Sequence, residues 1–425
     1  MLGSLLLAAL AAAADATPAA PPPGPQTESD AYTRYELLAP ESASFKITYE
    51  VTATTSGALS YFNPIRKGSA ARDEAVFDAM TGKPLPFTVV SGEEARKDPL
   101  MAGADTGSSF IRIALARPVP KGGQARLLIV KTYQDEKSYH RQGEGLVFDR
   151  PLGVRRNAIV LPAGYELTFC NVPAQVLTEP DGRLSVSFLN AGSGLAPLLL
   201  KARPGAQTGL AAAPGLATTA RSWEAPFAGE TELERLSERA HQDRDIVYFL
   251  QAPETHAFSL HHDYTEARPG IDRYLNLVRE GSSVSGPSAM VLDTGEKLST
   301  KILTGQELAE QKIAVDEPVK PDAQVVLISF APVKKGESIR LRVAETYTAP
   351  RSYRLEGNEL VFDRSLGRPR NAIVLPAGWY LTASAIPATV SLLEDGRVRL
   401  EFWNGRPDAA DVLIKARRRA AATVK

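Results

Sequence analysis

The stretch Leu146–Gly164, LVFDRPLGVRRNAIVLPAG, returns as Leu360–Gly378, LVFDRSLGRPRNAIVLPAG, so that residue 146 matches residue 360 with a shift of 214. The same shift holds without a gap from Thr132 to Arg203 in the first half of the chain. A repeat of this length indicates a tandem duplication in which each copy is one folding unit.

The correspondence continues upstream of this block. There, 38–45 matches 251–258 with a shift of 213, so the two copies differ in length by one residue between the early and the late half. We therefore place copy 1 at residues 35–203 and copy 2 at residues 248–417.

The segments outside the copies have their own composition. Residues 204–229 are rich in Gly, Pro and Ala, which is typical of a flexible linker. In 230–247, Leu233 and Leu236 lie three apart, with acidic residues early and a basic residue late, and this pattern predicts a connector with a short helix. Residues 418–425 form a basic tail.

Within each copy the pattern is that of β-strands. Segments such as Phe45–Val51 and Arg183–Phe188 alternate apolar and polar residues, as half-buried strands do. Gly182 and Gly396 each follow an Asp between two alternating runs, and such Asp-Gly pairs favour hairpin turns. The sequence therefore predicts an all-β fold of two tandem homologous antiparallel β-sandwich domains, joined by the linker and a short α-helix. Whether each copy is one sandwich or two stays open.

Composition limits the classes of function. Of the 425 residues, 49 are Lys or Arg and 49 are Asp or Glu, so the basic excess that a nucleic-acid-binding protein shows is missing. The single cysteine, Cys170, excludes an intrachain disulfide and a thiolate metal cluster. We expect no nucleic-acid partner and no cofactor.

The N-terminal sequence suggests export. Residues 1–16 are apolar and end in small residues, as a signal peptide does, and residues 17–34 form a Pro/Ala-rich leader that we expect to be disordered. The usual basic residue before the apolar run is missing, and we favour a start further upstream over an atypical signal. No later segment is long and apolar enough to be a transmembrane helix. These features predict a periplasmic or extracellular protein, and the alternative is a disordered leader on a cytoplasmic one.

Both copies carry the same polar residues around the quoted block. One interpretation is a pocket in each copy, in which arginines grip a carboxylate or sulfate and tyrosines provide contact area. The candidate ligand-binding residues are Tyr133, Tyr139, Arg150, Arg156, Asn157, Tyr347, Tyr353, Arg364, Arg370 and Asn371.

A structural interpretation of the same residues stays open. In it, Asp149 and Asp363 cap the loops and pair with the arginines, and the asparagines hold a bend before the next strand. Agreement between the copies does not separate the two interpretations, because fold and function would both maintain it.

Histidines of copy 2 suggest a metal site. His256, His261 and Asp263 are residue types that bind divalent metals. If the segment is a strand, His261 and His262 face opposite sides, whereas His261 and Asp263 share one. An ion-paired surface strand is the alternative.

Motifs of common enzymes are missing from the sequence, including the Gly-x-Ser-x-Gly elbow, the His-Glu-x-x-His pair and the phosphate-binding loop. We therefore expect an exported noncatalytic binding or scaffold protein of the bacterial cell envelope. Its loops would recognise a peptide, a glycan or an envelope protein. The alternatives are a hydrolase with a site between the two domains, or a metal-binding protein that uses the copy 2 histidines.

The alternating strands, the Leu-Pro-Ala-Gly corners at 161–164 and 375–378, and the Thr-Tyr pairs at 132–133 and 346–347 resemble two groups of proteins. One is the noncatalytic β-sandwich domains of large zinc aminopeptidases, whose zinc motif is missing here. The other is the lumenal part of ribophorin I. The resemblance is one of layout, and it implies a β-sandwich fold and no functional residues.

Overall fold

The structure is a computed structural model that describes residues 24–66, 70–192, 194–205, 238–315, 318–405 and 408–419. The expected signal peptide, most of the linker and the start of the predicted connector helix lie outside the described residues. Of the connector, residues 238–247 are described: 238–244 form turns and loop rather than a helix, and 245–247 already belong to the first strand of copy 2.

Copy 1 is built from strands, with three short helical turns. Its elements are β1 (Glu28–Leu37), η1 (Pro40–Ser42), β2 (Ser44–Ala53), β3 (Ser60–Ile65), β4 (Ala70–Asp78), β5 (Phe87–Ser91), α1 (Gly92–Ala95), η2 (Pro99–Met101), β6 (Ser109–Ala114), β7 (Ala125–Gln134), β8 (Tyr139–Gln142), β9 (Gly145–Leu152), β10 (Arg156–Val160), β11 (Tyr165–Cys170), β12 (Gln175–Thr178), β13 (Leu184–Leu189) and β14 (Ala196–Pro204).

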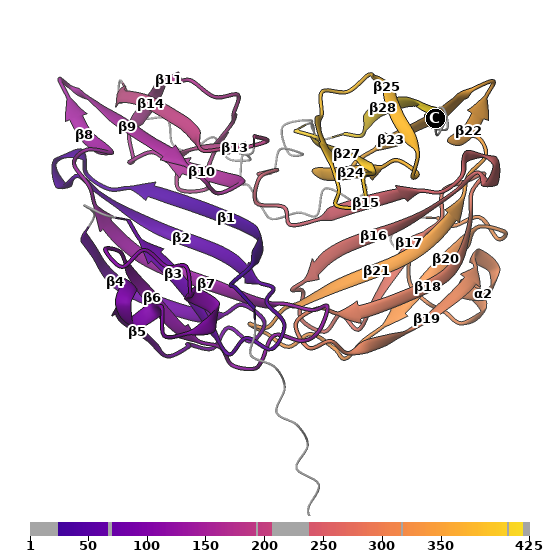
Figure 1. Cartoon of the computed structure of the whole chain (residues 1–425), viewed down its shortest axis with the longest axis horizontal. Helices are drawn as coiled ribbons and strands as arrows, with labels where there is room; N and C mark the ends of the chain where they lie inside the picture. The colour runs from indigo at the N-terminus through magenta and orange to yellow at the C-terminus, as the bar shows by residue number, and fades with distance from the viewer. Residues whose placement is uncertain are drawn as a thin grey trace, which may run out of the picture.

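Copy 2 repeats this order. Its elements are β15 (Asp245–Leu250), η4 (Pro253–Thr255), β16 (Ala257–Glu266), β17 (Arg273–Leu277), β18 (Ser283–Val291), β19 (Lys297–Thr304), α2 (Gly305–Glu310), β20 (Gln324–Ser329), β21 (Ile339–Thr348), β22 (Tyr353–Glu356), β23 (Glu359–Leu366), β24 (Arg370–Val374), β25 (Trp379–Ser384), β26 (Thr389–Leu392), β27 (Val398–Trp403) and β28 (Ala410–Arg418). The predicted all-β duplicated fold is confirmed (Figure 1).

The first strand starts earlier than the sequence suggested. β1 begins at Glu28, inside the segment 17–34 that we expected to be a disordered leader, because Glu28 and Ser29 already pair with the end of β2. The first residues of β1 are mostly polar, so the sequence there lacks the alternation of apolar and polar residues that marks a strand.

A long sheet is the backbone of each copy. In copy 1 its order is β12-β13-β10-β1-β2-β7-β4, and in copy 2 the same run, β26-β27-β24-β15-β16-β21-β18, continues into β19, β20 and β17. Pairing is antiparallel except between β1 and β10 and between β15 and β24, which run parallel. The prediction of wholly antiparallel sheets is therefore wrong for one strand pair in each copy, because these partners are far apart in the chain and meet only after the intervening strands have crossed over.

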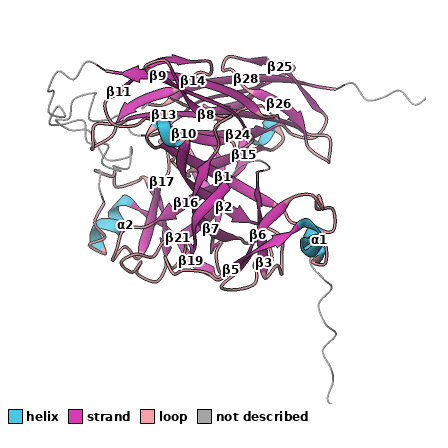
Figure 2. Cartoon of the chain, turned by 90° about the vertical axis from the view of Figure 1, so that its left-hand side faces the viewer, coloured by secondary structure: helices cyan, strands magenta, loops and turns pink. Residues whose placement is uncertain are grey.

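Each copy is one sandwich. A four-stranded sheet (β11-β14-β9-β8 or β22-β23-β28-β25) and the three strands β3-β6-β5 or β17-β20-β19 cover the same face of the long sheet. In copy 1, Tyr133 of the long sheet lies under Arg150 of β9, and Lys131, on the same face, donates to Asn63 of β3. The main cores of the two copies are separate clusters. Figure 2 shows the four-stranded sheets at one end of the molecule and α1 and α2 at its sides.

The copies meet through equivalent contacts in both directions. Gln124 N donates to Leu292 O at 2.8 Å, and Ser338 Oγ, at the position that matches Gln124, donates to Ala79 O at 2.8 Å. From this joint the copies open apart like the arms of a V (Figure 1). Such a self-complementary contact is the geometry of a two-fold symmetric dimer, here within one chain.

Candidate anion-binding pocket

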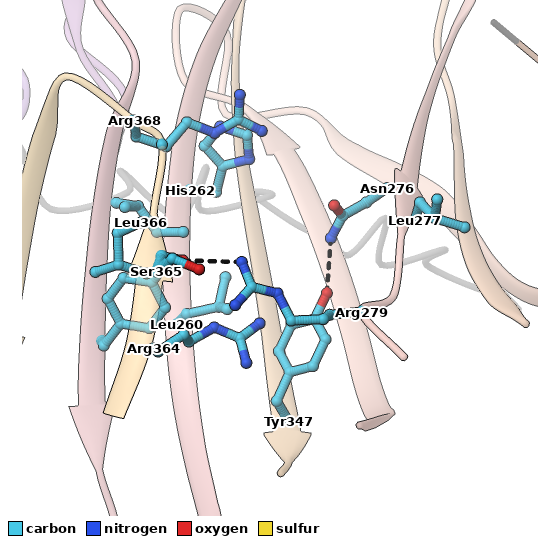
Figure 3. A pocket seen from close by; sticks show the side chains of 13 residues that line it. Leu260, His262, Asn276, Leu277, Arg279, Tyr347, Arg364, Ser365, Leu366 and Arg368 are labelled. Carbon is cyan, nitrogen blue, oxygen red and sulfur yellow. Dashed lines mark hydrogen bonds between the residues drawn. The ribbon is translucent and has the colours of Figure 1, made fainter. Parts of the chain in front are cut away.

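A pocket of 260 Å³ lies in copy 2 where the two smaller coverings of the long sheet meet (Figure 3). Its floor is the long sheet, with Tyr248, Leu260 and Tyr347. One wall comes from β23 and the loop after it, and the other from β17 and the loop after it. The pocket is therefore built from three parts of the fold that are far apart in the sequence.

Three arginines line this pocket: Arg279, Arg364 and Arg368. Arg279 donates from NH2 to Ser365 O at 2.8 Å. Arg364 lies over Phe258 and Tyr347, with its Cζ 5.5 Å and 5.9 Å from the ring centroids. Figure 3 shows the guanidinium groups of Arg279 and Arg364 in the centre of the pocket and Arg368 at one end.

The positive charge of Arg364 has no carboxylate partner among the described residues, and its NH1 has no hydrogen-bond partner there. Burial and the neighbouring Arg279 both lower the pKa of Arg364. Burial also lowers the pKa of Arg368, to about 10, which leaves it charged at neutral pH. A half-buried arginine such as Arg364, with no counter-charge among the described residues, is a feature of sites that bind anions.

The equivalent place in copy 1 is closed by an ion pair. Arg150, which matches Arg364, donates from NH1 to Asp135 Oδ2 at 2.9 Å, and Arg150 and Asp135 are 5% and 8% exposed. Burial opposes ionisation of Asp135, but hydrogen bonds from Ser138 and the charge of Arg150 outweigh it and lower its pKa. Copy 2 has Ala349 at the position of Asp135. The loss of this one carboxylate is what leaves Arg364 without a counter-charge.

A second difference between the copies reverses the charge of a side chain beneath the pocket. In copy 1, Lys131 Nζ donates to Asn63 Oδ1 at 2.6 Å. Copy 2 has Glu345 in place of Lys131, and Asn276 Nδ2 donates to Glu345 Oε2 at 2.7 Å and to Tyr347 OH at 3.0 Å. Burial raises the pKa of Glu345 to about 7. The amide of Asn276 is thus turned so that its nitrogen faces Glu345.

The predicted ligand residues fall into four groups. Arg364 and Tyr347 line the pocket. Tyr139 and Tyr353 are completely buried, and their hydroxyls donate to Leu38 O and Gln251 O. The prediction that these two tyrosines line a ligand site is therefore corrected, because they anchor the neighbouring turns from inside the core.

Four more predicted residues have structural contacts. Asn157 and Asn371 donate to Val154 O and Arg368 O, both at 2.7 Å, and hold the bend before the next strand. Arg156 donates to Ala240 O and His241 O, and Arg370 donates to Asp243 O, so both arginines hold the connector between the copies.

In copy 1 the remaining two, Tyr133 and Arg150, face each other inside the closed site. Asp149 and Asp363 do not pair with the arginines as the structural interpretation expected. They point to solvent because adjacent residues of β9 and β23 face opposite sides.

The metal hypothesis is not supported by the geometry. Arg342 engages both oxygens of Asp263 at 2.8 Å, His261 packs against Phe249, and His256 Nδ1 lies 3.0 Å from Tyr353 O. Among the described residues, no three His, Cys, Asp or Glu side chains gather closely enough to hold an ion. The predicted ligand set therefore has no support in the geometry, because the carboxylate of Asp263 pairs with Arg342 of a neighbouring strand.

A larger cavity of 460 Å³ lies between the copies, where the hydrolase alternative would place its site. Several of its charged side chains pair with one another: Arg342 with Asp263, and Arg155 and Arg399 with Glu401. The hydrolase therefore stays an alternative without a supporting contact.

Sequence reasoning missed Arg279, Arg368, Asn276 and Glu345. A comparison of the two copies position by position contained the signal, because the exchanges of Asp135 for Ala349 and of Lys131 for Glu345 change charge within an otherwise matching block. Only the structure shows that these exchanges surround one cavity.

Within the described ranges, no helix is long and apolar enough to cross a bilayer. No protein-family model matches the chain, and no curated protein matches it.

Several solved structures show a partial likeness. An M1 zinc metallopeptidase from Deinococcus radiodurans is 12% identical with a TM-score of 0.29, over 43% of this chain and 42% of that one. A two-domain M1 zinc metallopeptidase mutant bound to L-tryptophan is 12% identical with a TM-score of 0.29, over 42% of this chain and 43% of that one. An aminopeptidase N family protein from Idiomarina loihiensis is 12% identical with a TM-score of 0.26, over 40% of this chain and 29% of that one. The chain spans less than half the length of each, and a likeness this low carries no argument about fold or function.

Proposed function

We propose that the protein is an exported, noncatalytic binding protein of the bacterial cell envelope, and that its copy 2 pocket grips an acidic group of the partner. The observation that carries this proposal is the charge of Arg364, which lacks the carboxylate that its copy 1 counterpart has. A guanidinium group presents parallel N–H donors that match a carboxylate or a sulfate. Copy 1 then serves as the structural half.

The burial of the pocket supports binding rather than chance surface charge. Exposed ion pairs contribute little, whereas a half-buried guanidinium without a counter-charge costs free energy unless something compensates it. A bound anion supplies that compensation.

The proposal of export rests on the apolar residues at the start of the chain. Mass spectrometry of periplasmic and cytoplasmic extracts tests it. Recovery of the protein in the cytoplasm alone, with its N-terminus intact, would contradict export.

The pocket is tested with inorganic sulfate and acetate as probes, by calorimetric titration of the full chain. Arg364→Met is expected to weaken binding of either anion by about 10-fold or more, since hydrogen bonds to charged groups are each worth about 1.5–3 kcal/mol. Arg66→Gln, at the exposed copy 1 position that matches Arg279, is the control and should bind as the wild type does.

A second variant tests the comparison between the copies. Ala349→Asp restores the carboxylate found in copy 1, and it is expected to abolish anion binding while raising the melting temperature, because the new carboxylate satisfies Arg364. Unchanged binding by both Arg364→Met and Ala349→Asp would contradict the proposed function.

A further inference from the structure

We infer that the acidic group bound in copy 2 is the carboxyl terminus of a polypeptide whose last side chain is small and apolar. This inference rests on the proposed function and names the ligand class of the same pocket. It is carried by three surfaces that the pocket brings together: a cationic one, an apolar one and a single hydrogen-bond acceptor.

The cationic surface fits a terminal carboxylate. Arg279 and Arg364 approach from the two walls, and Arg279 is fixed by its bond to Ser365 O. A planar carboxylate can take parallel N–H donors from one guanidinium and a further donor from the other. Fixing a guanidinium before the ligand arrives lowers the entropy lost on binding.

The apolar surface is the reason to choose a peptide end over a free inorganic anion. Leu277, which is 44% exposed, lines the same cavity as the arginines, beside the buried Leu260 and Leu366. A sulfate or phosphate ion would leave the side chain of Leu277 against water. A terminal residue with a short aliphatic side chain covers it and places its carboxylate against the arginines at the same time.

The acceptor is the side-chain oxygen of Asn276. Its nitrogen is engaged by Glu345 and Tyr347, which fixes the amide so that Oδ1 is left as an acceptor. No hydrogen bond from the described residues reaches this oxygen, and Figure 3 shows it directed away from the Tyr347 hydroxyl. The backbone N–H of a terminal residue lies close to its own carboxylate, as this arrangement requires.

Size and aromatic exposure argue against an acidic sugar. The volume of 260 Å³ is below the roughly 300–1,000 Å³ of pockets that hold drug-sized ligands, so it suits one residue. Tyr248 and Tyr347 are 5% and 4% exposed, and neither offers the open ring face on which a sugar stacks.

The test measures binding of four probes to the full chain by calorimetric titration. They are the peptide acetyl-Gly-Gly-Ser-Val with a free carboxylate, the same peptide as its C-terminal amide, the free acid N-methylated at its last peptide nitrogen, and glucuronate. We expect the free acid to bind at least 10-fold more tightly than the amide and about 10-fold more tightly than the N-methyl peptide. Arg364→Met should remove the difference between acid and amide.

Each other outcome has a definite meaning. Equal binding of acid and amide would overturn the inference. Tighter binding of glucuronate than of the peptide acid would overturn it too, in favour of an acidic glycan. If sulfate binds in an Arg364-dependent way but no peptide does, the inference fails and the proposed function stands. If no anion binds, both fail.

Discussion

At the scale of single residues, Arg150 and Arg364 show how one carboxylate decides what an arginine does. Arg150 is 5% exposed and is neutralised by Asp135, as a buried charge must be. Arg364 keeps the equivalent position and lies over Phe258 and Tyr347, which match Phe45 and Tyr133, but Ala349 gives it no counter-charge. Conservation of the arginine between copies therefore says nothing about its role until its partner is known.

Glu345 gives a prediction about pH. Its folded pKa of about 7 lies above the ordinary value of 4.5, because the side chain is 2% exposed. Between these pH values the folded state binds more protons than the unfolded state, so this residue makes stability fall as the pH rises from about 4.5 to about 7. The full loss is about 3 kcal/mol.

Glu345→Gln should remove this loss, and its melting temperature should exceed that of the wild type at pH 8 while approaching it near pH 4. The measurement is the melting temperature across that pH range. Glu280→Gln, at a side chain that is 79% exposed, is the control and should follow the wild type throughout. Parallel curves for Glu345→Gln and the wild type would count against the assigned pKa.

At the scale of elements, the two Asp-Gly hairpins behave as the sequence predicted. Gly182 and Gly396 have φ of +83° and +76°, between β12 and β13 and between β26 and β27. The preceding aspartates accept hydrogen bonds from Arg183 N and Arg397 N at 3.0 and 3.1 Å, which closes both turns in the same way. Local sequence is enough to fix such turns because all their partners lie within a few residues.

Gly396→Ala is expected to destabilise the protein by about 1–2 kcal/mol, the cost of a left-handed backbone for a residue with Cβ. No heavy atom lies within 4 Å of the added Cβ, so the effect is one of backbone conformation alone. Denaturant unfolding measures it. Gly103→Ala, where space is equally open and φ is not in the left-handed region, is the control and should cost nothing. An unchanged midpoint for Gly396→Ala would contradict the assignment of the turn.

At the scale of the whole molecule, polar contacts hold the joint between the copies. Asp293 is completely buried and accepts from Arg126 Nε at 2.7 Å, from Arg126 NH2 at 2.9 Å and from Arg340 N at 2.9 Å. Arg126 and Arg340 are equivalent positions of the two copies. The carboxylate of Asp293 thus binds an arginine of copy 1 and the backbone of copy 2. Arg156 of copy 1 and Arg370 of copy 2 also donate hydrogen bonds to carbonyl groups of the connector.

Asp293→Asn should weaken this joint by about 3–5 kcal/mol, because it leaves Arg126 facing a neutral amide in a buried place. We expect a lower melting temperature and a larger radius of gyration in small-angle X-ray scattering, as the copies separate. Asp272→Asn breaks only an exposed pair with Arg273 and should change neither. A variant with wild-type scattering and melting would show that the joint rests on other contacts.

Of the candidate site, the sequence predicted the residue types but not their partners. It singled out Arg364 and Tyr347, which line the pocket, together with Tyr139 and Tyr353, which are buried in the cores of copy 1 and copy 2. Repetition marks both kinds equally, because a core tyrosine and a ligand-binding tyrosine are copied alike. It also missed Arg279 as a site residue, although Arg279-Glu-Gly-Ser282 repeats Arg66-Lys-Gly-Ser69, because this segment is far in the sequence from the block that carries Arg364.

The sequence by itself determined the strands, the Asp-Gly turns and the two copies, because alternation of apolar residues and turn chemistry are local and a duplication is visible letter by letter. The tertiary structure alone decided the parallel partners of β1 and β15, the tie of Arg156 and Arg370 to the connector, and the pairing of Arg150 with Asp135 rather than Asp149. All of these depend on which distant segments meet across a sheet, and the charge left on Arg364 appears only once those neighbours are in place.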